Sequence, residues 1–291
     1  MSFAADIKNE LCKAEHSKKQ LYLLAKGAAF AMSENGEECF FQTENKRVAD
    51  CIAQGFSHAD EKPRFSVGKA EKTASGRRAG VFYTVTLYDK GFAKTLPDCS
   101  DDDAFGVFLR GVFLVCGFAA NPEKGYQLEL FLHDREKCRL LAQLIEEHGM
   151  TVKQSSRRGS SFLYIKESEK ISDMLTYMGA MMQAMEIMNV KIYKEVRNNV
   201  NRTVNCEAAN LDKTIAAAAK QTDDINYIFD TKGRGYLTDE LLQVAEIRLK
   251  SPELSLSDIG KLLEPPISRS GVNHRLKKIG EIAARLRAGK E

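Results

Sequence analysis

Residues 254–279 read LSLSDIGKLLEPPISRSGVNHRLKKI, two helical patterns separated by a pair of prolines. Ser255 or Ser257 is placed to cap the first helix, which cannot continue through Pro265-Pro266. Ser268 starts the second helix, whose apolar residues recur at intervals of four, three, four and three: Val272, Leu276, Ile279, Ala283 and Leu286. This spacing predicts a helix that buries one face.

The other face of the second helix is polar and basic. It carries the candidate DNA-binding residues Ser268, Arg269, Ser270, Asn273, His274, Arg275, Lys277 and Lys278. Asn pairs well with adenine, and Arg or Lys with guanine or phosphate, so this face suits a DNA major groove. Two short helices joined by a tight turn, the basic one second, indicate a helix-turn-helix, with Thr238 capping a third helix upstream. The alternative is a surface helical hairpin with a basic face.

Charge is distributed unevenly along the chain. The 291 residues hold 43 Lys and Arg against 40 Asp and Glu, a formal net charge of +3. Basic residues concentrate in residues 152–166, 191–205 and 268–290, whereas acids concentrate in residues 98–103. A charged run is usually a solvated face, but three separate basic runs favour a polyanionic partner.

Residues 18–180 read twice as helix, strand, helix and strands, which indicates an internal duplication. Asp134 and Ser168 are expected to cap helices, the last of which stops near Gly179. Turns are expected at residues 73–80 and at Arg158-Gly159. The expected helices cover 18–32, 46–56, 101–116 and 135–148, and the expected strands cover 38–43, 64–69, 80–88, 125–133, 150–155 and 161–166.

The segment that follows changes character: it is Met-rich from residue 178, then Asn-rich, then an Ala-rich helix suited to a connector. We expect domains at 1–190 and 231–291, joined by a basic, Asn-rich and helical linker at 191–230. Arg197, Asn198, Asn201 and Arg202 either line a phosphate track or cap helices and fix the linker. The basic stretches Lys153–Arg158 and Arg64–Arg78 either touch DNA or are solvated loops. His133 and His148 are expected to be structural, His148 through a helix dipole.

Several classes of protein are disfavoured by the sequence. No stretch of about 20 apolar residues suits a membrane helix, and the N-terminal MSFAADIKNEL does not read as a secretory signal. The seven cysteines lack zinc spacing and are expected to be free thiols in a reducing cytosol. P-loop, GxGxxG, HExxH and GxSxG motifs are absent. We therefore expect no cofactor, no metal site and no catalytic residues.

Four strings together resemble the WhiA family of bacterial regulators. They are SFAADIKNEL at residues 2–11, FLRGVFLVCGFAANPEKGYQLEL at 108–130, RNNVNRTVNCEAANLDKTIAAAAKQ at 197–221, and the opening string at 254–279. The resemblance covers nearly the whole chain in order. It implies an α+β fold: a duplicated LAGLIDADG homing-endonuclease-like N-terminal domain followed by an all-α helix-turn-helix domain similar to region 4 of sigma factors.

The resemblance also implies that DNA cleavage has been lost. In the endonucleases the penultimate residue of each LAGLIDADG motif is a metal-binding acid; here that position is Cys116, and Ala28 to Ala31 offer no acid in the first motif. Mg²⁺ prefers hard oxygen ligands, which a thiol and a methyl group do not supply. Gly27, Gly111 and Gly117 are expected to let two helices pack closely.

The predicted function is that of a non-catalytic, sequence-specific transcriptional regulator, and the resemblance to the WhiA family implies that its targets are bacterial cell division and sporulation genes. Its partners are double-stranded promoter DNA and, as a hypothesis, RNA polymerase or another regulator. A cytoplasmic, nucleoid-associated location without a membrane partner is expected. The alternatives are a chromosome-associated adaptor acting through the N-terminal domain and, with less support, a residual endonuclease.

Overall fold

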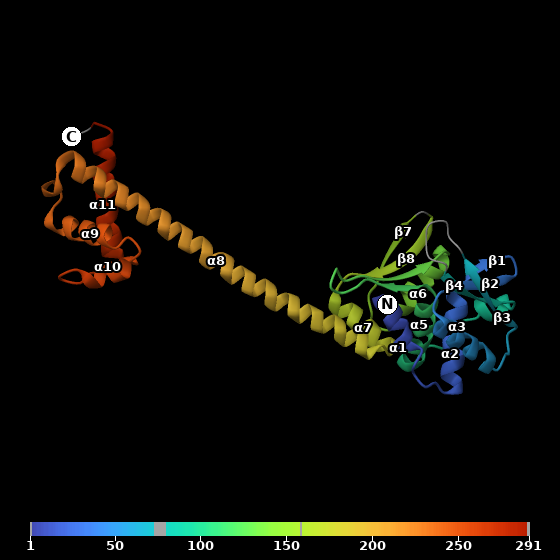
Figure 1. The fold of residues 1–291 in the computed structure, drawn as a ribbon. Coiled ribbons are helices and arrows are strands. Elements are labelled where there is room, and N and C mark those ends of the chain that lie inside the picture. The colour runs from blue at the N-terminus through green and yellow to red at the C-terminus, as the bar shows by residue number, and fades with distance from the viewer. Residues whose placement is uncertain (1, 73–79, 158, 290–291) are drawn as a thin grey trace. The chain divides into compact units, whose positions relative to one another are not determined.

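The computed structural model describes residues 2–72, 80–157 and 159–289. The chain forms two compact units, one ending at Glu195 and the other starting at Val196. The long helix α8 (Met181–Lys232) contributes to both units (Figure 1). No helix within the described ranges is both long enough and apolar enough to cross a membrane.

The N-terminal unit is built from two halves with the same order of elements. The first half contains α2 (Lys18–Ala31), β1 (Ser33–Asn35), β2 (Glu38–Thr43), α3 (Lys46–His58), β3 (Phe65–Lys72) and β4 (Gly80–Leu87). The second contains α5 (Asp102–Cys116), β5 (Gly117–Ala119), β6 (Leu128–Leu132), α6 (Arg135–Glu147), β7 (Lys153–Arg157) and β8 (Ser160–Ile165). Each half makes a four-stranded antiparallel sheet, in the orders β1-β2-β4-β3 and β5-β6-β8-β7. The expected internal duplication is confirmed.

Three further helices complete this unit: α1 (Phe3–Leu11), α4 (Lys90–Lys94) and α7 (Ser168–Met178). One continuous apolar core joins both halves, with α2 and α5 packed against each other at its centre. Residues alternate between buried and half-buried along β8, as expected for a strand with one face on a core. The two sheets and the central helices can be followed in Figure 1.

The helix caps confirm one prediction and correct another. The side chain of Asp134 accepts hydrogen bonds from the backbone N–H groups of Glu136 and Lys137 and caps α6, as expected. Glu167, not Ser168, is the N-cap residue of α7; Ser168 is buried as its first residue. The expected turn at residues 73–79 lies outside the described residues, as does Arg158 of the other.

Helix α8 runs through the whole of the expected helical linker and is longer than it, with 52 continuous helical residues. No Gly or Pro occurs between residues 181 and 232, so nothing in the sequence forces a break. The helix follows Gly179 and ends before Gly233, both with positive φ (93° and 80°). The Glu10 carboxylate accepts hydrogen bonds from the Met182 and Gln183 N–H groups at 2.7 and 3.1 Å. The Asn-rich stretch lies inside α8, so the hypothesis that its side chains cap helices is wrong.

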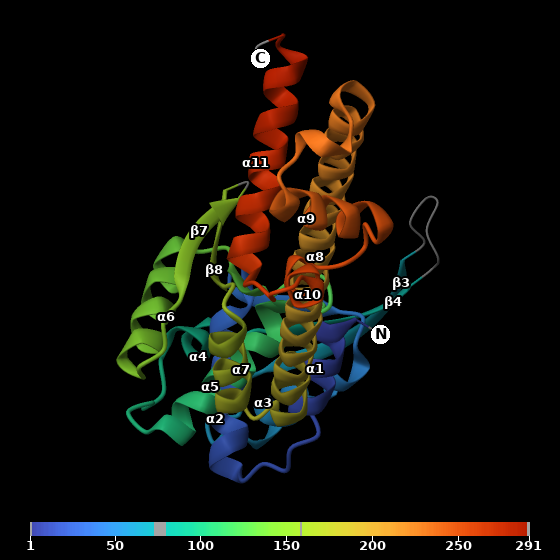
Figure 2. The same ribbon diagram turned by 90° about the vertical axis from the view of Figure 1, so that its left-hand side faces the viewer.

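The C-terminal unit packs α9 (Asp239–Lys250), α10 (Leu256–Leu262) and α11 (Arg269–Arg287) against the C-terminal end of α8. A short 3-10 helix, η1 (Arg234–Tyr236), precedes α9. Ile225 and Ile228 of α8 are fully buried in the core of this unit. Figure 2 shows α9, α10 and α11 gathered around this end of α8. The expected all-α helix-turn-helix domain is confirmed.

Candidate nucleic-acid interface

The two helices of the helix-turn-helix begin at serine caps. Ser255 Oγ accepts a hydrogen bond from Asp258 N at 3.2 Å, so Ser255 and not Ser257 caps α10. Ser268 Oγ accepts from Gly271 N at 3.2 Å and caps α11. Thr238 stands at the N-cap position of α9, but its side chain makes no capping hydrogen bond. The sequence therefore predicted the start of α11 correctly.

A close backbone contact fixes the turn between α10 and α11. Ile267 N donates a hydrogen bond to Gly260 O at 3.0 Å. A Cβ atom at Gly260 would overlap the carbonyl oxygen of Ile267, so only glycine allows this approach. The contact sets how α11 leaves the turn, and hence which of its faces is presented to solvent.

The predicted apolar face of α11 is confirmed. Val272, Leu276, Ile279 and Ala283 are at most 3% exposed, and Leu286 is half-buried against the same core. Burying a side chain of this size contributes about 1.5–3 kcal/mol. The core thus holds α11 in one rotational setting about its axis.

The opposite face of α11 is exposed and makes few internal contacts. Within the ranges that the structure describes, six exposed residues in the first half of this helix have side chains that form no hydrogen bond or ion pair. We call this set the α11 surface: Arg269, Ser270, Asn273, His274, Lys277 and Lys278. Its donors and positive charges are therefore free to meet an external partner.

Two basic residues of the same stretch have structural partners instead. Arg275 Nη2 lies 3.4 Å from Glu240 Oε2 of α9, and the Arg275 side chain is only 22% exposed. Arg287 Nη1 lies 2.5 Å from Oδ1 of the buried Asp224 of α8. Both pairs tie α11 to neighbouring helices, so Arg275 differs from the other predicted DNA-binding residues.

Shallow grooves along α8 add residues that the sequence analysis missed. Asn273 lines one groove with Lys220 and another with Lys213. Lys213 and Lys220 are exposed and seven residues apart, so they project from the same side of α8. The seven-residue spacing of these two lysines is visible in the sequence. It points to a shared binding surface only once α8 is known to pass beside α11.

The four residues predicted in the Asn-rich stretch are all exposed on α8. Successive helical residues are rotated by about 100°, so Asn198 and Arg202 share one strip and Arg197 and Asn201 the next. The four side chains therefore form two adjoining strips rather than one line.

The LAGLIDADG-like motifs keep their packing role. A Cβ on Gly27 of α2 would overlap Phe108 O of α5, and a Cβ on Gly111 of α5 would overlap Leu24 O of α2. Glycine at these two positions lets the backbones touch, as expected. Gly117 plays a different part from the one predicted: its Cβ would meet Phe113 of its own helix, not α2.

This symmetry identifies the residues that replace the acids. Counting the same number of residues onward from Gly27 and Gly111 leads to Met32 and Cys116. Met32 is buried, and the Cys116 thiol donates a hydrogen bond to Val112 O at 3.3 Å. Burial raises the pKa of Cys116 to about 12, so the thiol stays neutral at neutral pH. A thioether and a neutral thiol do not fit Mg²⁺, which requires hard oxygen ligands.

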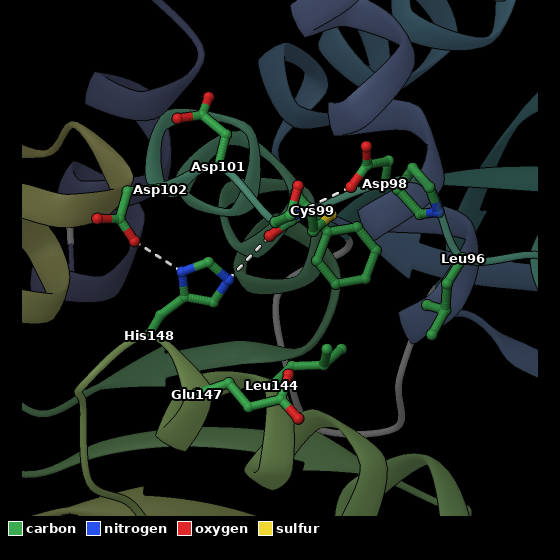
Figure 3. Close-up of a pocket in the computed structure, with 11 residues that line it drawn as sticks. Leu96, Asp98, Cys99, Asp101, Asp102, Leu144, Glu147 and His148 are labelled. Carbon is green, nitrogen blue, oxygen red and sulfur yellow. Dashed lines mark hydrogen bonds and ion pairs between the residues drawn. The ribbon is translucent and has the colours of Figure 1, made fainter.

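One pocket of the N-terminal unit is lined by side chains that are held by several mutual contacts (Figure 3). His148 Nδ1 lies 2.7 Å from Asp102 Oδ1, and His148 Nε2 lies 2.9 Å from Cys99 O. The ring also stacks on Phe105 with centroids 4.2 Å apart. Both nitrogens of the His148 ring therefore have hydrogen-bond partners within the protein. These contacts support the structural role predicted for His148. His133 Nδ1 similarly lies 3.2 Å from Ser160 Oγ.

The two basic stretches of this unit lie on equivalent strands. Lys153–Arg157 forms β7 and is exposed throughout, while β3 (Phe65–Lys72) carries all of the described part of the Arg64–Arg78 stretch except Arg64. Each strand is at the edge of its sheet. The described residues of both stretches therefore lie mainly in strands, as expected for 64–69 and 150–155, rather than in loops.

A duplicated α/β unit with vestigial LAGLIDADG-like helices, followed by a helix-turn-helix with a free polar face, defines a two-part protein of the helix-turn-helix class. Family models agree: residues 105–197 match the WhiA LAGLIDADG-like domain, and residues 200–283 match the WhiA C-terminal HTH domain. The chain belongs to the WhiA family.

Known relatives extend this match over the full length. The "Probable cell division protein WhiA" of Lachnospira eligens is 37% identical, over 99% of this chain and 98% of the relative. Its namesake in Clostridium botulinum is 35% identical, over 99% of this chain and 100% of the relative. The crystal structure of full-length DUF199/WhiA from Thermatoga maritima has a TM-score of 0.61 at 26% identity, covering 98% of this chain and 99% of that one. The isolated N-terminal LAGLIDADG domain of DUF199/WhiA has a TM-score of 0.52 at 21% identity, covering 61% and 90% respectively; this shows the fold alone.

Proposed function

We propose that the protein is a sequence-specific DNA-binding transcriptional regulator of bacterial cell division and sporulation genes. The observation that carries this proposal is the α11 surface, a polar and basic face held outward by a buried apolar face on the same helix. Asn273 reads a base edge, and Lys277 and Lys278 contact phosphates or guanine. The cell-division assignment follows the name of the relatives, "Probable cell division protein WhiA".

Further contacts are assigned to α8. Lys213 and Lys220 flank Asn273 along the grooves and would meet the DNA backbone beside the site read by α11. Arg197, Asn198, Asn201 and Arg202 extend the phosphate contacts along α8. Arg275 orients α11 through Glu240 rather than reading bases. A cytoplasmic, nucleoid-associated protein that cooperates with RNA polymerase fits this role.

The protein acts without cleaving DNA, and the replacement of both motif acids by Met32 and Cys116 supports this part of the proposal. The remaining glycines support a retained scaffold. The test is fluorescence anisotropy of the full chain on promoter and scrambled duplexes across a salt series, with and without Mg²⁺. The samples are then examined for nicks. Salt-sensitive, preferential binding to intact DNA is expected. Mg²⁺-dependent nicking would restore the endonuclease alternative, and absent binding would favour the adaptor.

A further inference from the structure

One of the grooves beside α11 is lined by positive and uncharged side chains. Its volume is about 520 Å³, in the range of small-molecule sites, and all of its lining residues belong to the C-terminal unit. Lys213 of α8, Arg248 of α9 and Arg269 of α11 line this groove, and no Asp or Glu does so among the residues that the structure describes. We call it the Arg248 groove. A cleft lined by charges of one sign attracts ligands of the opposite sign, so this groove favours an anion.

Arg248 is a buried charge without a charged partner. The residue is only 3% exposed. Its Nη1 donates hydrogen bonds to Pro252 O at 3.0 Å and to Leu254 O at 2.9 Å, but both acceptors are uncharged carbonyl groups. Its Nε is buried without an acceptor, and Arg248 forms no ion pair within the described ranges. Buried charges are normally paired, so this guanidinium leaves room for an anion supplied from outside the chain.

Two nearby acids do not supply that partner. Burial lowers the pKa of Arg248, and the exposed Glu253 opposes this effect from a distance without forming an ion pair. The carboxylate of Asp258 accepts a hydrogen bond from Ser255 Oγ at 2.7 Å and lies 2.9 Å from Lys261 Nζ. The charge of Asp258 is therefore already matched by Lys261, and the groove keeps its positive character.

The remaining walls of the groove show what else its occupant carries. Leu254 and Leu256 provide aliphatic surface, while Ser255 and Ser257 provide hydroxyl groups. Gln221 of α8 also lines the groove, and its Oε1 is buried without a hydrogen-bond donor in the described structure. A bare inorganic anion uses neither the aliphatic wall nor this amide oxygen. An organic molecule with hydroxyl groups and an anionic head uses both.

We propose that the Arg248 groove is a binding site for a small phosphorylated molecule, with its phosphate toward Arg248, Lys213 and Arg269. Guanidinium and ammonium groups are the side chains that bind phosphate most strongly, because their hydrogen bonds are charge-assisted. The organic part lies against Leu254 and Leu256. A DNA duplex on the α11 surface keeps its phosphates outside the protein, whereas a small molecule enters the groove and meets the buried guanidinium.

The site gives the protein a means of regulation, and this part of the inference rests on the proposed function. Lys213, Arg269 and Asn273 line the groove and are also assigned to DNA contacts. A bound phosphorylated molecule neutralises the two basic residues and occupies the space beside Asn273. Occupation of the groove should therefore lower the affinity for DNA.

The first experiment measures binding without DNA, so its result is independent of the proposed function. Inorganic pyrophosphate is the probe, titrated calorimetrically into the full-length protein at constant ionic strength. Saturable binding at one site is expected. A Lys213→Ala/Arg269→Ala double variant should bind at least about tenfold more weakly, because two charge-assisted contacts are lost. Both residues are exposed and form no internal ion pair, so the fold is retained.

The matched control is Lys278→Ala/Arg285→Ala, which removes the same two kinds of charge from exposed positions on α11 outside the groove. It should bind pyrophosphate as the wild type does. Absence of saturable binding, or an equal loss in the two double variants, would overturn the proposal, because the attraction would then be that of any basic surface. Arg248→Met should abolish binding; if this variant does not fold, the two double variants still decide the outcome.

The second experiment tests the regulatory part by fluorescence anisotropy on duplex DNA. Pyrophosphate should weaken DNA binding by the wild type more than sodium chloride of equal ionic strength does, and this excess should disappear in Lys213→Ala/Arg269→Ala. Pyrophosphate that binds without changing the affinity for DNA would overturn the regulatory part. A protein that binds pyrophosphate but no DNA would contradict the proposed function and leave the phosphate site supported.

Discussion

Gly27 of α2 and Gly111 of α5 occupy equivalent positions, and each presses its helix backbone against a carbonyl of the other helix. The contact is reciprocal: Gly27 meets Phe108, and Gly111 meets Leu24. This places the axis of the duplication between the two helices and explains why a single core serves both halves. Glycine at both positions therefore lets the two halves share this close helix contact.

The first prediction concerns this contact. Gly27→Ala should destabilise the N-terminal unit by about 1–3 kcal/mol, because the added methyl group has no space. Helix propensity alone predicts the opposite effect, an increase of about 1 kcal/mol in the free energy of unfolding, because alanine favours helix more than glycine does. Urea unfolding followed by circular dichroism distinguishes the two. Gly125→Ala, where a Cβ would meet nothing within 4 Å, is the matched control. Stabilisation of the Gly27 variant would show that the helices can separate without cost.

The turn of the helix-turn-helix gives a second prediction. Gly260→Ala should weaken DNA binding on every sequence, because the added Cβ displaces Ile267 and disturbs the setting of α11. Gly271→Ala is a suitable control: its Cβ would meet only the flexible Ile267 side chain, at 3.3 Å or more. Anisotropy titrations compare the two variants. Equal affinities would mean that the close approach at Gly260 does not position α11.

The lysines of the α11 surface provide a third prediction. Lys277→Ala and Lys278→Ala should each lower the affinity for all duplexes alike, because each substitution removes one contact between a lysine and a DNA phosphate. For the same reason, each should reduce the slope of log affinity against log salt concentration by about one unit. Binding isotherms across a salt series give the slope. Arg285→Ala, an exposed change further along α11, is the control. A slope unaffected by either lysine change would place DNA on another surface.

A pH dependence follows from Glu34, whose carboxylate lies 2.8 Å from Lys137 Nζ and 2.9 Å from Lys90 Nζ. Hydrogen bonds from Lys137 and Lys90 lower the pKa of Glu34 from its usual 4.5 to about 2. A lowered carboxyl pKa stabilises the fold above about pH 4.5, and this contribution disappears as pH falls toward 2. Glu34→Gln should therefore cost about 1 kcal/mol at pH 7, and the cost should shrink below pH 4.5.

Thermal unfolding of wild type and Glu34→Gln in steps from pH 7 to pH 3 tests this dependence. Glu136→Gln removes an ion pair in which the Arg139 side chain is 64% exposed and the Glu136 side chain 74%, and it should have almost no effect at any pH. A constant difference between wild type and the Glu34 variant would show that the two lysines do not depress its pKa.

Much of the fold could be predicted because its signals are local. Capping residues and apolar spacing identified α11, and alternating β-branched and aromatic residues identified β2 and β4. The short strands β1 and β5 were missed, since three residues acquire strand structure only from their pairing partners β2 and β6. The continuity of α8 was also missed: asparagines disfavour helix only weakly, and no breaker interrupts the segment.

The candidate site was predictable in part for the same reason. The exposed face of α11 follows from its buried face, which the sequence displays directly. The partners of Arg275 and Arg287 are on α9 and α8, so no local pattern separates these structural residues from Lys277 and Lys278. Lys213 and Lys220 became candidates only when the fold placed them beside Asn273. In each of these cases the sequence does not show which distant segments lie against each other, and the role of the residue depends on that contact.

The central claim is that α11 reads DNA sequence, and Asn273 tests it most directly. Duplexes enriched by the full-length protein from a random-sequence pool would be compared with scrambled duplexes, using wild type and Asn273→Ala. The account predicts that the variant loses about 1–3 kcal/mol on the enriched site and nothing on scrambled DNA. Failure to enrich any sequence, or an equal loss on both duplexes, would contradict it.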